Sequence, residues 1–294
     1  MTFNKLSSIV PIIKKVGDLF VEGIVISIVN NKGGVGKTTV ACNLGAALSK
    51  LKMRVLIIDM DPQCNTTGIL LHDTVIRNSL YELLDYKQSD NIVVDSCIYL
   101  SKQQGLYCLP NVEETAGLEL DLISRYPASL SLVREKVRDY VKQNFDFTII
   151  DNPPNMGLFV VNSLYASDFV IVPNDAGSSY SLDGLRKALD LIDSVKESGE
   201  SSLRFLRLLI NRVDLRTAIS RVILEDIKSR FKANQVFKTI IPISTILQQA
   251  EYSRQTIFQK YQNSRAAQAY RQLAKELITI LGVKEQSPNK TEKI

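Results

Sequence analysis

The stretch Lys32-Gly33-Gly34-Val35-Gly36-Lys37-Thr38-Thr39 lies between an apolar run, residues 24–29, and a helical pattern, residues 40–51. A buried strand, a glycine-rich loop and a helix in this order form the context of a phosphate-binding loop. The glycines let the backbone turn tightly and bring its N–H groups close to an anion. The helix N-terminus adds a partial positive charge at the same point. The stretch therefore predicts a loop that binds the phosphates of a nucleotide.

The side chains of this loop have separate predicted roles. We expect Lys37 to reach the β- and γ-phosphates and the Thr38 hydroxyl to ligate Mg²⁺. Thr39 is placed to hydrogen-bond the α-phosphate. The remaining loop positions are expected to surround the phosphates with backbone groups: Gly33, Gly34, Val35 and Gly36. The alternative, a glycine-rich turn without a ligand, does not explain why strand, loop, Gly-Lys-Thr and helix all agree.

The composition of the chain is that of a globular protein. With 294 residues, 45% of them hydrophobic and 23% charged, it is long enough for one large or two modest domains. No apolar run approaches the ~20 residues that span a bilayer, and the N-terminus lacks the pattern of a secretory signal. We therefore expect a cytoplasmic protein. A net charge of +5 permits an acidic partner such as DNA without requiring one.

The cysteines and the histidine argue against a metal cluster. The single histidine, His72, cannot form a histidine-based metal or catalytic site, and we expect it on a surface loop. The cysteines are scattered without Cys-x-x-Cys spacing, which is typical of reduced, partly buried thiols in a cytoplasmic protein. These are Cys42, Cys64, Cys97 and Cys108.

The lysine at position 32 sets this loop apart from an ordinary P-loop, which has no lysine there. Lys32 precedes a Gly-Gly pair, and this arrangement resembles the deviant Walker A loop of the ParA/MinD family of P-loop ATPases. The resemblance implies ATP and Mg²⁺ as cofactors. It also implies an ATP-sandwich homodimer in which Lys32 reaches the nucleotide of the partner subunit. The alternative for Lys32 is a solvated loop lysine.

Two further apolar runs end in carboxylates. Residues 54–59 lead into Asp59-Met-Asp61-Pro-Gln-Cys-Asn65, and residues 145–151 lead into Asp151-Asn-Pro-Pro154. In open α/β sheets, functional groups lie at the carboxyl ends of the strands. Asp151 is a Walker B signal, a carboxylate expected to hold Mg²⁺ through water. The alternative for all three aspartates is helix capping in a βα loop.

Both stretches also resemble motifs of the same family, Asp-x-Asp-Pro-Gln and Asp-x-Pro-Pro. The resemblance implies that Asp61 orients or activates the attacking water and that Asp59 lies near the Mg²⁺ ion, outside its first ligand sphere. Asn152 stands where the family commonly has Cys or Thr. Two looser matches concern the base: Asn211, at a later strand end, is expected to bind the adenine edge, and Pro242 to lie where adenine meets the backbone. A turn asparagine is the alternative for Asn211.

The rest of the chain alternates strand and helix patterns. Further strands are predicted at residues 105–110, 168–173, 204–210 and 236–241. Helices are predicted at residues 79–84, 113–123, 130–143, 182–196, 217–231 and 266–281. The sequence therefore predicts an α/β fold, a doubly wound, mostly parallel sheet flanked by helices, with one P-loop ATPase domain over residues 23–283.

Segments at both ends lie outside the predicted domain. Residues 1–22 carry apolar side chains at helical spacing, with lysines off that stripe. Such an amphipathic extension can dock on its own chain, on a partner or second subunit, or on a membrane surface. Residues 284–294 form a polar tail, broken by Pro288, that we expect to be disordered.

Two functions are compatible with these motifs. The first is a ParA-like ATPase that dimerises with ATP, binds DNA without sequence preference and hydrolyses ATP when a ParB-like or other adaptor stimulates it. It would segregate plasmid or chromosomal DNA, or another cargo, and associate with the nucleoid when ATP-bound. The second is a MinD-like ATPase that cycles on membranes. MinD-like proteins end in a basic amphipathic helix, and the polar tail here argues against a membrane partner. The cysteines argue against an iron–sulfur relative.

The basic residues expected to contact DNA are Arg216, with Arg254 and Arg265 as weaker candidates. Arg216 matches a DNA-linked arginine of ParA relatives. Two departures from the family pattern concern the position and strength of this surface. Ile243 stands where relatives often carry an arginine, and Gln249 stands where they carry a glutamate. The sequence therefore predicts a DNA-binding surface that is either shifted from that of relatives or weak.

Overall fold

The computed structural model describes residues 22–88, 91–176, 181–198, 202–214 and 216–283. The predicted tail, and all of the predicted N-terminal extension except residue 22, lie outside these residues. The strands are β1 Ile24–Ile28, β2 Val55–Asp59, β3 Tyr99–Leu100, β4 Leu106–Leu109, β5 Phe147–Asp151, β6 Phe169–Asp175 and β7 Arg204–Asn211. The helices are α1 Lys37–Lys50, α2 Asn65–Leu71, α3 Leu80–Leu84, α4 Leu118–Ile123, α5 Asp139–Asn144, α6 Leu158–Ala166, α7 Ser181–Glu197, α8 Ala218–Arg230, α9 Thr245–Tyr252, α10 Ile257–Lys260 and α11 Arg265–Leu281.

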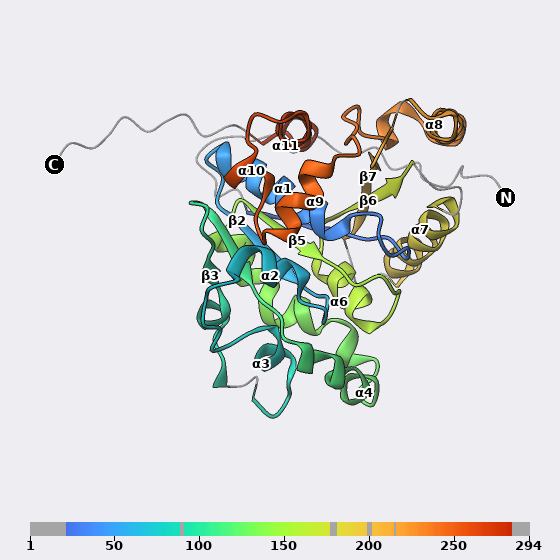
Figure 1. Cartoon of the computed structure of the whole chain (residues 1–294). Helices are drawn as coiled ribbons and strands as arrows, with labels where there is room; N and C mark the ends of the chain where they lie inside the picture. The colour runs from blue at the N-terminus through green and yellow to red at the C-terminus, as the bar shows by residue number, and fades with distance from the viewer. Residues whose placement is uncertain (1–21, 89–90, 177–180, 199–201, 215, 284–294) are drawn as a thin grey trace.

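The strands form one sheet in the order β3-β4-β2-β5-β1-β6-β7. All pairs are parallel except β3 with β4 at one edge. The chain starts at β1 near the middle, builds outward to β4, and returns through β5 before continuing to β7 on the other side. Helices cover both faces of the sheet (Figure 1). This is the predicted doubly wound α/β fold.

Strand side chains alternate between the two faces of the sheet, and both faces are buried. In β1, Ile26 and Ile28 belong to the core under α1 and α11, whereas Val25 belongs to the core on the opposite face. In β2, Ile57 and Ile58 divide in the same way. A side-chain period of two with apolar residues at nearly every position is typical of a parallel strand covered by helices on both sides.

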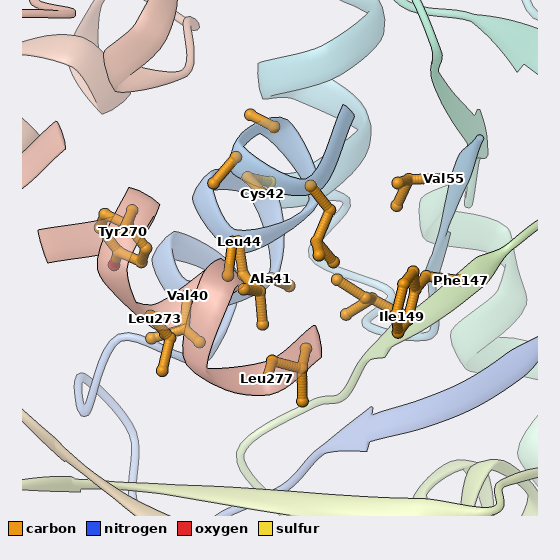
Figure 2. Packing of buried hydrophobic residues seen from close by; sticks show 14 of the residues in the cluster. Val40, Ala41, Cys42, Leu44, Val55, Phe147, Ile149, Tyr270, Leu273 and Leu277 are labelled. Carbon is orange, nitrogen blue, oxygen red and sulfur yellow. The ribbon is translucent and has the colours of Figure 1, made fainter. Parts of the chain in front are cut away.

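Helix α1 follows the P-loop directly and lies between the sheet and α11 (Figure 2). Small residues on α1 permit this close packing: a Cβ added at Gly45 would lie 2.8 Å from Cδ1 of Ile57 on β2. On the opposite side of α1, Leu273 and Leu277 of α11 are fully buried. Because α1 is fixed from two sides, the loop at its N-terminus has a fixed position over the sheet.

Two strand-end carboxylates meet in the sheet because of the strand order. β2 and β5 are neighbours, and Asp59 and Asp151 are paired in register at their carboxyl ends. The loop that follows β1 leaves the same edge, since Ile28 is also in register with Asp151. The sheet therefore brings together the P-loop and the two carboxylate motifs predicted from the sequence.

The predicted strand at residues 236–241 is wrong. Two isolated bridges, from Val236 to Leu208 and from Pro242 to Val213, and a few backbone hydrogen bonds join this segment to β7 and the residues after it, without forming a continuous ladder. A side chain takes the backbone donors that would continue a ladder: the Glu276 carboxylate accepts the N–H of Lys238 at 2.8 Å and that of Thr239 at 2.9 Å.

Several elements were absent from the sequence prediction, namely β3 and the helices α2, α6, α9 and α10. The helix predicted at residues 113–123 starts as a 3₁₀ turn, Glu113–Gly117, before α4. The helix predicted at residues 130–143 contains a π-helical turn, Arg134–Arg138, before α5. Within the described part of the chain, no helix is both long and apolar enough to cross a membrane.

Candidate functional site

The P-loop turns over the carboxyl end of β1 on two glycines with left-handed backbone angles. Gly34 has a φ of 75° and Gly36 a φ of 86°, values that L side chains rarely adopt. Gly36 caps α1, and its carbonyl oxygen accepts the first helical bond from the N–H of Val40 at 2.9 Å. A Cβ at Gly36 would also lie 2.6 Å from the side-chain nitrogen of Asn211. Glycine is therefore required here by both conformation and space.

The two loop lysines are held close to each other. Lys37 is buried, and its Nζ donates to the carbonyl oxygen of Lys32 at 3.3 Å. Burial lowers the pKa of Lys37, while the charges of Asp151 and Asp61 oppose that shift. The backbone N–H of Lys32 is fixed by Asn30, whose Oδ1 accepts it at 2.9 Å. The ammonium that we expect to contact phosphates thus lies inside the loop, facing the strand-end carboxylates.

Asp151 has one satisfied oxygen and one unsatisfied oxygen. Oδ2 accepts bonds from the hydroxyls of Thr38 at 2.7 Å and Thr66 at 2.8 Å. Oδ1 is buried and has no hydrogen-bond partner. Burial raises the pKa of Asp151 to about 6, although both threonine bonds act against that shift. A buried carboxylate oxygen without a partner is costly in an isolated protein and indicates that a ligand belongs beside it.

Asp59 is buried beside it and is held more completely. Its Oδ2 accepts the backbone N–H and the hydroxyl of Thr67, at 2.8 and 2.7 Å. Its Oδ1 accepts the N–H of Asp61 at 3.2 Å. Burial, followed by the charge of Asp151, raises the pKa of Asp59 to about 7. Asp61 follows two residues later, is also buried, and its Oδ1 accepts the N–H of Gln63 at 3.0 Å.

These residues fit a hydrated divalent cation. Among the described residues, no group of three or more His, Cys, Asp or Glu side chains is arranged to hold a metal by itself. The unpaired oxygen of Asp151 and the neighbouring Thr38 hydroxyl are instead the partial set that Mg²⁺ takes when water and phosphate supply its other ligands. A cation there would also reduce the repulsion between Asp151 and Asp59.

A pocket extends from the P-loop to the predicted base-binding residues. It is lined by Gly36, Thr39, Asn211, Arg212, Pro242, Ile243, Ser244, Leu247, Gln248 and Glu251. The structure thus places Asn211 and Pro242 in one pocket. The Nδ2 of Asn211 donates to the carbonyl oxygen of Val35 at 2.7 Å, so this side chain also fixes the loop. The Thr39 hydroxyl donates to the carboxylate of Glu251 on α9.

Four side chains of this site were not predicted from the sequence. Thr66 and Thr67 directly follow the Asp59 motif, and the closeness of these hydroxyl side chains to a strand-end carboxylate in the sequence could have predicted their contact with it. Asn30 lies just before the loop sequence, and a polar residue at the end of an apolar run could likewise have predicted a role in the site. No sequence pattern indicated a role for Glu251, because it belongs to a helix more than two hundred residues later in the chain.

The three predicted DNA-contacting arginines are not all together. Arg216 and Arg265 line one pocket. The Arg216 side chain is 88% exposed but forms a two-pronged ion pair with Asp214, both N–O distances being 2.8 Å. Arg254 does not line that pocket, and its charge acts on Asp73 instead. The structure therefore keeps Arg216 and Arg265 as one surface and separates Arg254 from it.

Comparison with known proteins defines the class. A family model described as an AAA domain matches residues 23–205. The sporulation initiation inhibitor protein Soj of Bacillus subtilis is 35% identical over 256 residues, which cover 87% of this chain and 98% of Soj. The chromosome partitioning protein ParA of Myxococcus xanthus is 31% identical, over 87% of this chain and 88% of ParA. A crystal structure of cobyrinic acid a,c-diamide synthase from Mycobacterium smegmatis, with bound ADP and magnesium, superposes with a TM-score of 0.75 at 28% identity, covering 92% and 99% of the two chains.

The fold, the P-loop and these similarities define a P-loop nucleotide hydrolase. More specifically, the chain belongs to the ParA/MinD family of P-loop ATPases, and its relatives include partitioning proteins of the Soj and ParA type. The family predicted from Lys32 and the two carboxylate motifs is confirmed.

The buried Asp151 gives a prediction for the nucleotide-free protein. The pKa of Asp151 in the folded protein, about 6, lies above the ordinary value of 3.8. The protonated carboxyl group is the form compatible with burial, so the stability that it allows is fully present below pH 3.8 and is lost as pH rises through about 6. Asp151→Asn removes the buried charge. In urea unfolding with EDTA we expect the variant to be more stable than the parent by about 1–3 kcal/mol at pH 8, with a gain that shrinks toward pH 4.

Asp190→Asn, on the exposed face of α7, is the control and should change stability by less than about 0.5 kcal/mol at either pH. A gain at Asp151 that is the same at pH 8 and pH 4, or a loss at pH 8, would contradict the assignment of this carboxylate as the destabilising charge.

Proposed function

We propose that this protein is a ParA-like ATPase. It binds ATP with Mg²⁺, forms an ATP-sandwich homodimer, and in that form binds DNA without sequence preference. A ParB-like or other adaptor stimulates hydrolysis to ADP and phosphate and releases the dimer, so that plasmid or chromosomal DNA, or another cargo, is segregated or positioned. The protein is cytoplasmic and associates with the nucleoid when ATP-bound.

One observation carries the nucleotide part of this proposal. The P-loop, the unpaired oxygen of Asp151 and the Thr38 hydroxyl lie at one edge of the sheet, where two strand-end carboxylates are in register. Mg²⁺ bound there would offset the negative charge that develops in phosphoryl transfer. The residues Thr38 and Asp151 would hold it, and Asp59 would lie near it, outside its first ligand sphere.

The chain's own residues have distinct parts in hydrolysis. Lys37 contacts the β- and γ-phosphates, and Gly33 to Gly36 present backbone N–H groups to them. Asp61 orients the attacking water, because its carboxylate follows β2 at the phosphate end of the sheet. Asn211 and Pro242 receive the adenine. Lys32 reaches the nucleotide of the partner subunit, and its backbone is fixed for this by Asn30.

The DNA part of the proposal rests on charge and on dimerisation. Arg216 and Arg265 line one concave surface, and a dimer presents two such surfaces, so that weak phosphate contacts add in one complex. Asp214 lowers the positive potential there because it pairs with Arg216. Sedimentation with DNA and with liposomes, each with ATP, tests this part. Sedimentation with liposomes alone would support the MinD-like alternative.

The first prediction concerns turnover. Asp61→Ala should keep ATP binding and dimerisation but lower the steady-state rate of phosphate release by about a hundredfold or more, since a group that orients the nucleophile is lost. Asp61→Asn is the matched variant, because its side-chain oxygen still accepts the N–H of Gln63 and preserves the turn. A rate within about threefold of the parent in both variants would refute the role of Asp61.

The second prediction separates the two loop lysines. Lys32→Ala should bind ATP as a monomer and lose the ATP-dependent dimer in light scattering, because its proposed contact is to the partner's nucleotide. Lys37→Ala should weaken ATP binding itself. Lys50→Ala, at the exposed end of α1, should change neither property. A dimer of normal stability in the Lys32 variant would show that this lysine does not act across the interface.

The third prediction concerns the DNA surface. Arg216→Ala should weaken binding of the ATP-bound dimer to all DNA sequences alike. It should also reduce the slope of log affinity against log salt by roughly one unit for each phosphate that the arginine neutralises. Asp214→Asn should strengthen binding, because it frees the charge of Arg216. Arg230→Ala is the control, since Arg230 is also paired with an aspartate but lies away from the pocket. Unchanged DNA affinity in both the Arg216 and Asp214 variants would remove this surface from the proposal.

A further inference from the structure

Helix α9 forms one wall of the pocket between the P-loop and the predicted base site. Its side chains Leu247, Gln248 and Glu251 line that pocket, and Leu247 and Gln248 precede Glu251 by four and three residues, which places both beside it on the helix surface. Leu247 is buried, whereas Gln248 and Glu251 carry the polar groups. The wall is therefore apolar at its base and hydrogen-bonding at its surface.

The order of groups along the pocket follows the order of groups in a nucleotide. Thr39 and Gly36 lie at the phosphate end, and Thr39 is the residue expected to bond the α-phosphate. Asn211 and Pro242 form the predicted base end of the same pocket. In a nucleoside triphosphate the sugar joins the base to the α-phosphate. The sugar must therefore lie between these two ends, against the polar side of α9.

The carboxylate of Glu251 has the chemistry that a ribose requires. A ribose presents two adjacent hydroxyl donors, and a carboxylate presents two acceptor oxygens that can take both. In the structure this carboxylate accepts the hydroxyl of Thr39. When an α-phosphate takes over the Thr39 hydroxyl, the carboxylate loses that donor and is left beside the sugar.

Electrostatics adds a second constraint. A carboxylate that stayed on Thr39 would face the negatively charged α-phosphate at short range, which costs free energy in a partly buried pocket. Turning toward the sugar hydroxyls separates the like charges and replaces the lost hydrogen bond. A deoxyribose offers one donor fewer, so this replacement is incomplete.

We propose that Glu251 binds the ribose hydroxyls of the nucleotide and makes the site selective for ribonucleotides over deoxyribonucleotides. The inference rests on the proposed function, because it requires a nucleotide in this pocket. It assigns a specificity-determining residue that none of the P-loop or carboxylate motifs contains.

The experiment compares the affinities of ATP, 2′-deoxyATP and 3′-deoxyATP with Mg²⁺, by calorimetry or by competition with a fluorescent nucleotide. We expect the parent to bind ATP about tenfold or more tightly than either deoxynucleotide, since a hydrogen bond from a neutral donor to a charged acceptor is lost. In Glu251→Ala that ratio should fall to within about twofold. Because the ratio is measured on one protein sample, a general loss of binding does not mimic this result.

Two further variants complete the design. Glu251→Gln keeps one acceptor and the volume of the side chain, so it should fold as the parent does and show a reduced ratio. Its affinity for 2′-deoxyATP should equal or exceed that of the parent, because the charge facing the α-phosphate is gone. Gln249→Ala is the control on the same helix: its Oε1 accepts the Tyr261 hydroxyl at 3.2 Å, it does not line the pocket, and the ratio should stay at the parental value.

The outcomes separate this inference from the proposed function. A parent that binds ATP and both deoxynucleotides equally overturns the role of Glu251 but leaves the ATPase proposal standing. A parental ratio retained in both the Ala and Gln variants does the same. A parent that binds none of the three nucleotides overturns both proposals.

Discussion

The burial of the Asp151 carboxylate is the constraint on which the rest of the site depends. Its position at the end of β5 puts a charge inside the protein, where two threonine hydroxyls and the charge of Lys37 compensate it, and one oxygen remains without a partner. Thr38 comes from the P-loop and Thr66 from α2, so this one carboxylate joins three segments. The sheet must place Asp151 at the end of β5, and helix α1 must hold Thr38 against its carboxylate, before any ligand can bind there.

Helix α1 meets both demands because it is packed on two sides. The sheet fixes one face through close contact at Gly45, and α11 fixes the other with Tyr270, Leu273 and Leu277 (Figure 2). Most residues of α1 are buried, on nearly all sides of the helix, so a larger or smaller side chain at almost any position would disturb the packing. The apolar packing therefore offsets the unfavourable burial of Asp151 and Asp59, and the rigid helix keeps Thr38 and Lys37 facing them.

The sequence predicted what is local and periodic. Strand, loop and helix around Lys37 were predicted because apolar runs, glycines and a helical pattern are adjacent in the chain, and the carboxylates of Asp59 and Asp151 because each ends an apolar run. It failed where distant residues compete for the backbone: Glu276 takes the donors of residues 238 and 239, so a strand pattern at 236–241 forms no ladder. The role of Glu251 could not be predicted for the same reason, since only folding brings α9 next to Thr39. The pairing of Arg216 with Asp214 was not predicted, because it depends on side-chain geometry that spacing does not encode.

The segment that failed to become a strand also has a place in the architecture. Pro242, Ile243 and Ser244 line the pocket beside the P-loop and also the pocket that contains Arg216 and Arg265. A strand hydrogen-bonded along its whole length would be fixed to β7, whereas this segment is held by a few bonds to residues 208–213 and by Glu276. Because the two pockets share these residues, the position of this segment determines the shape of both. The wall between the nucleotide pocket and the arginine surface is therefore a part of the fold that is held by few backbone hydrogen bonds.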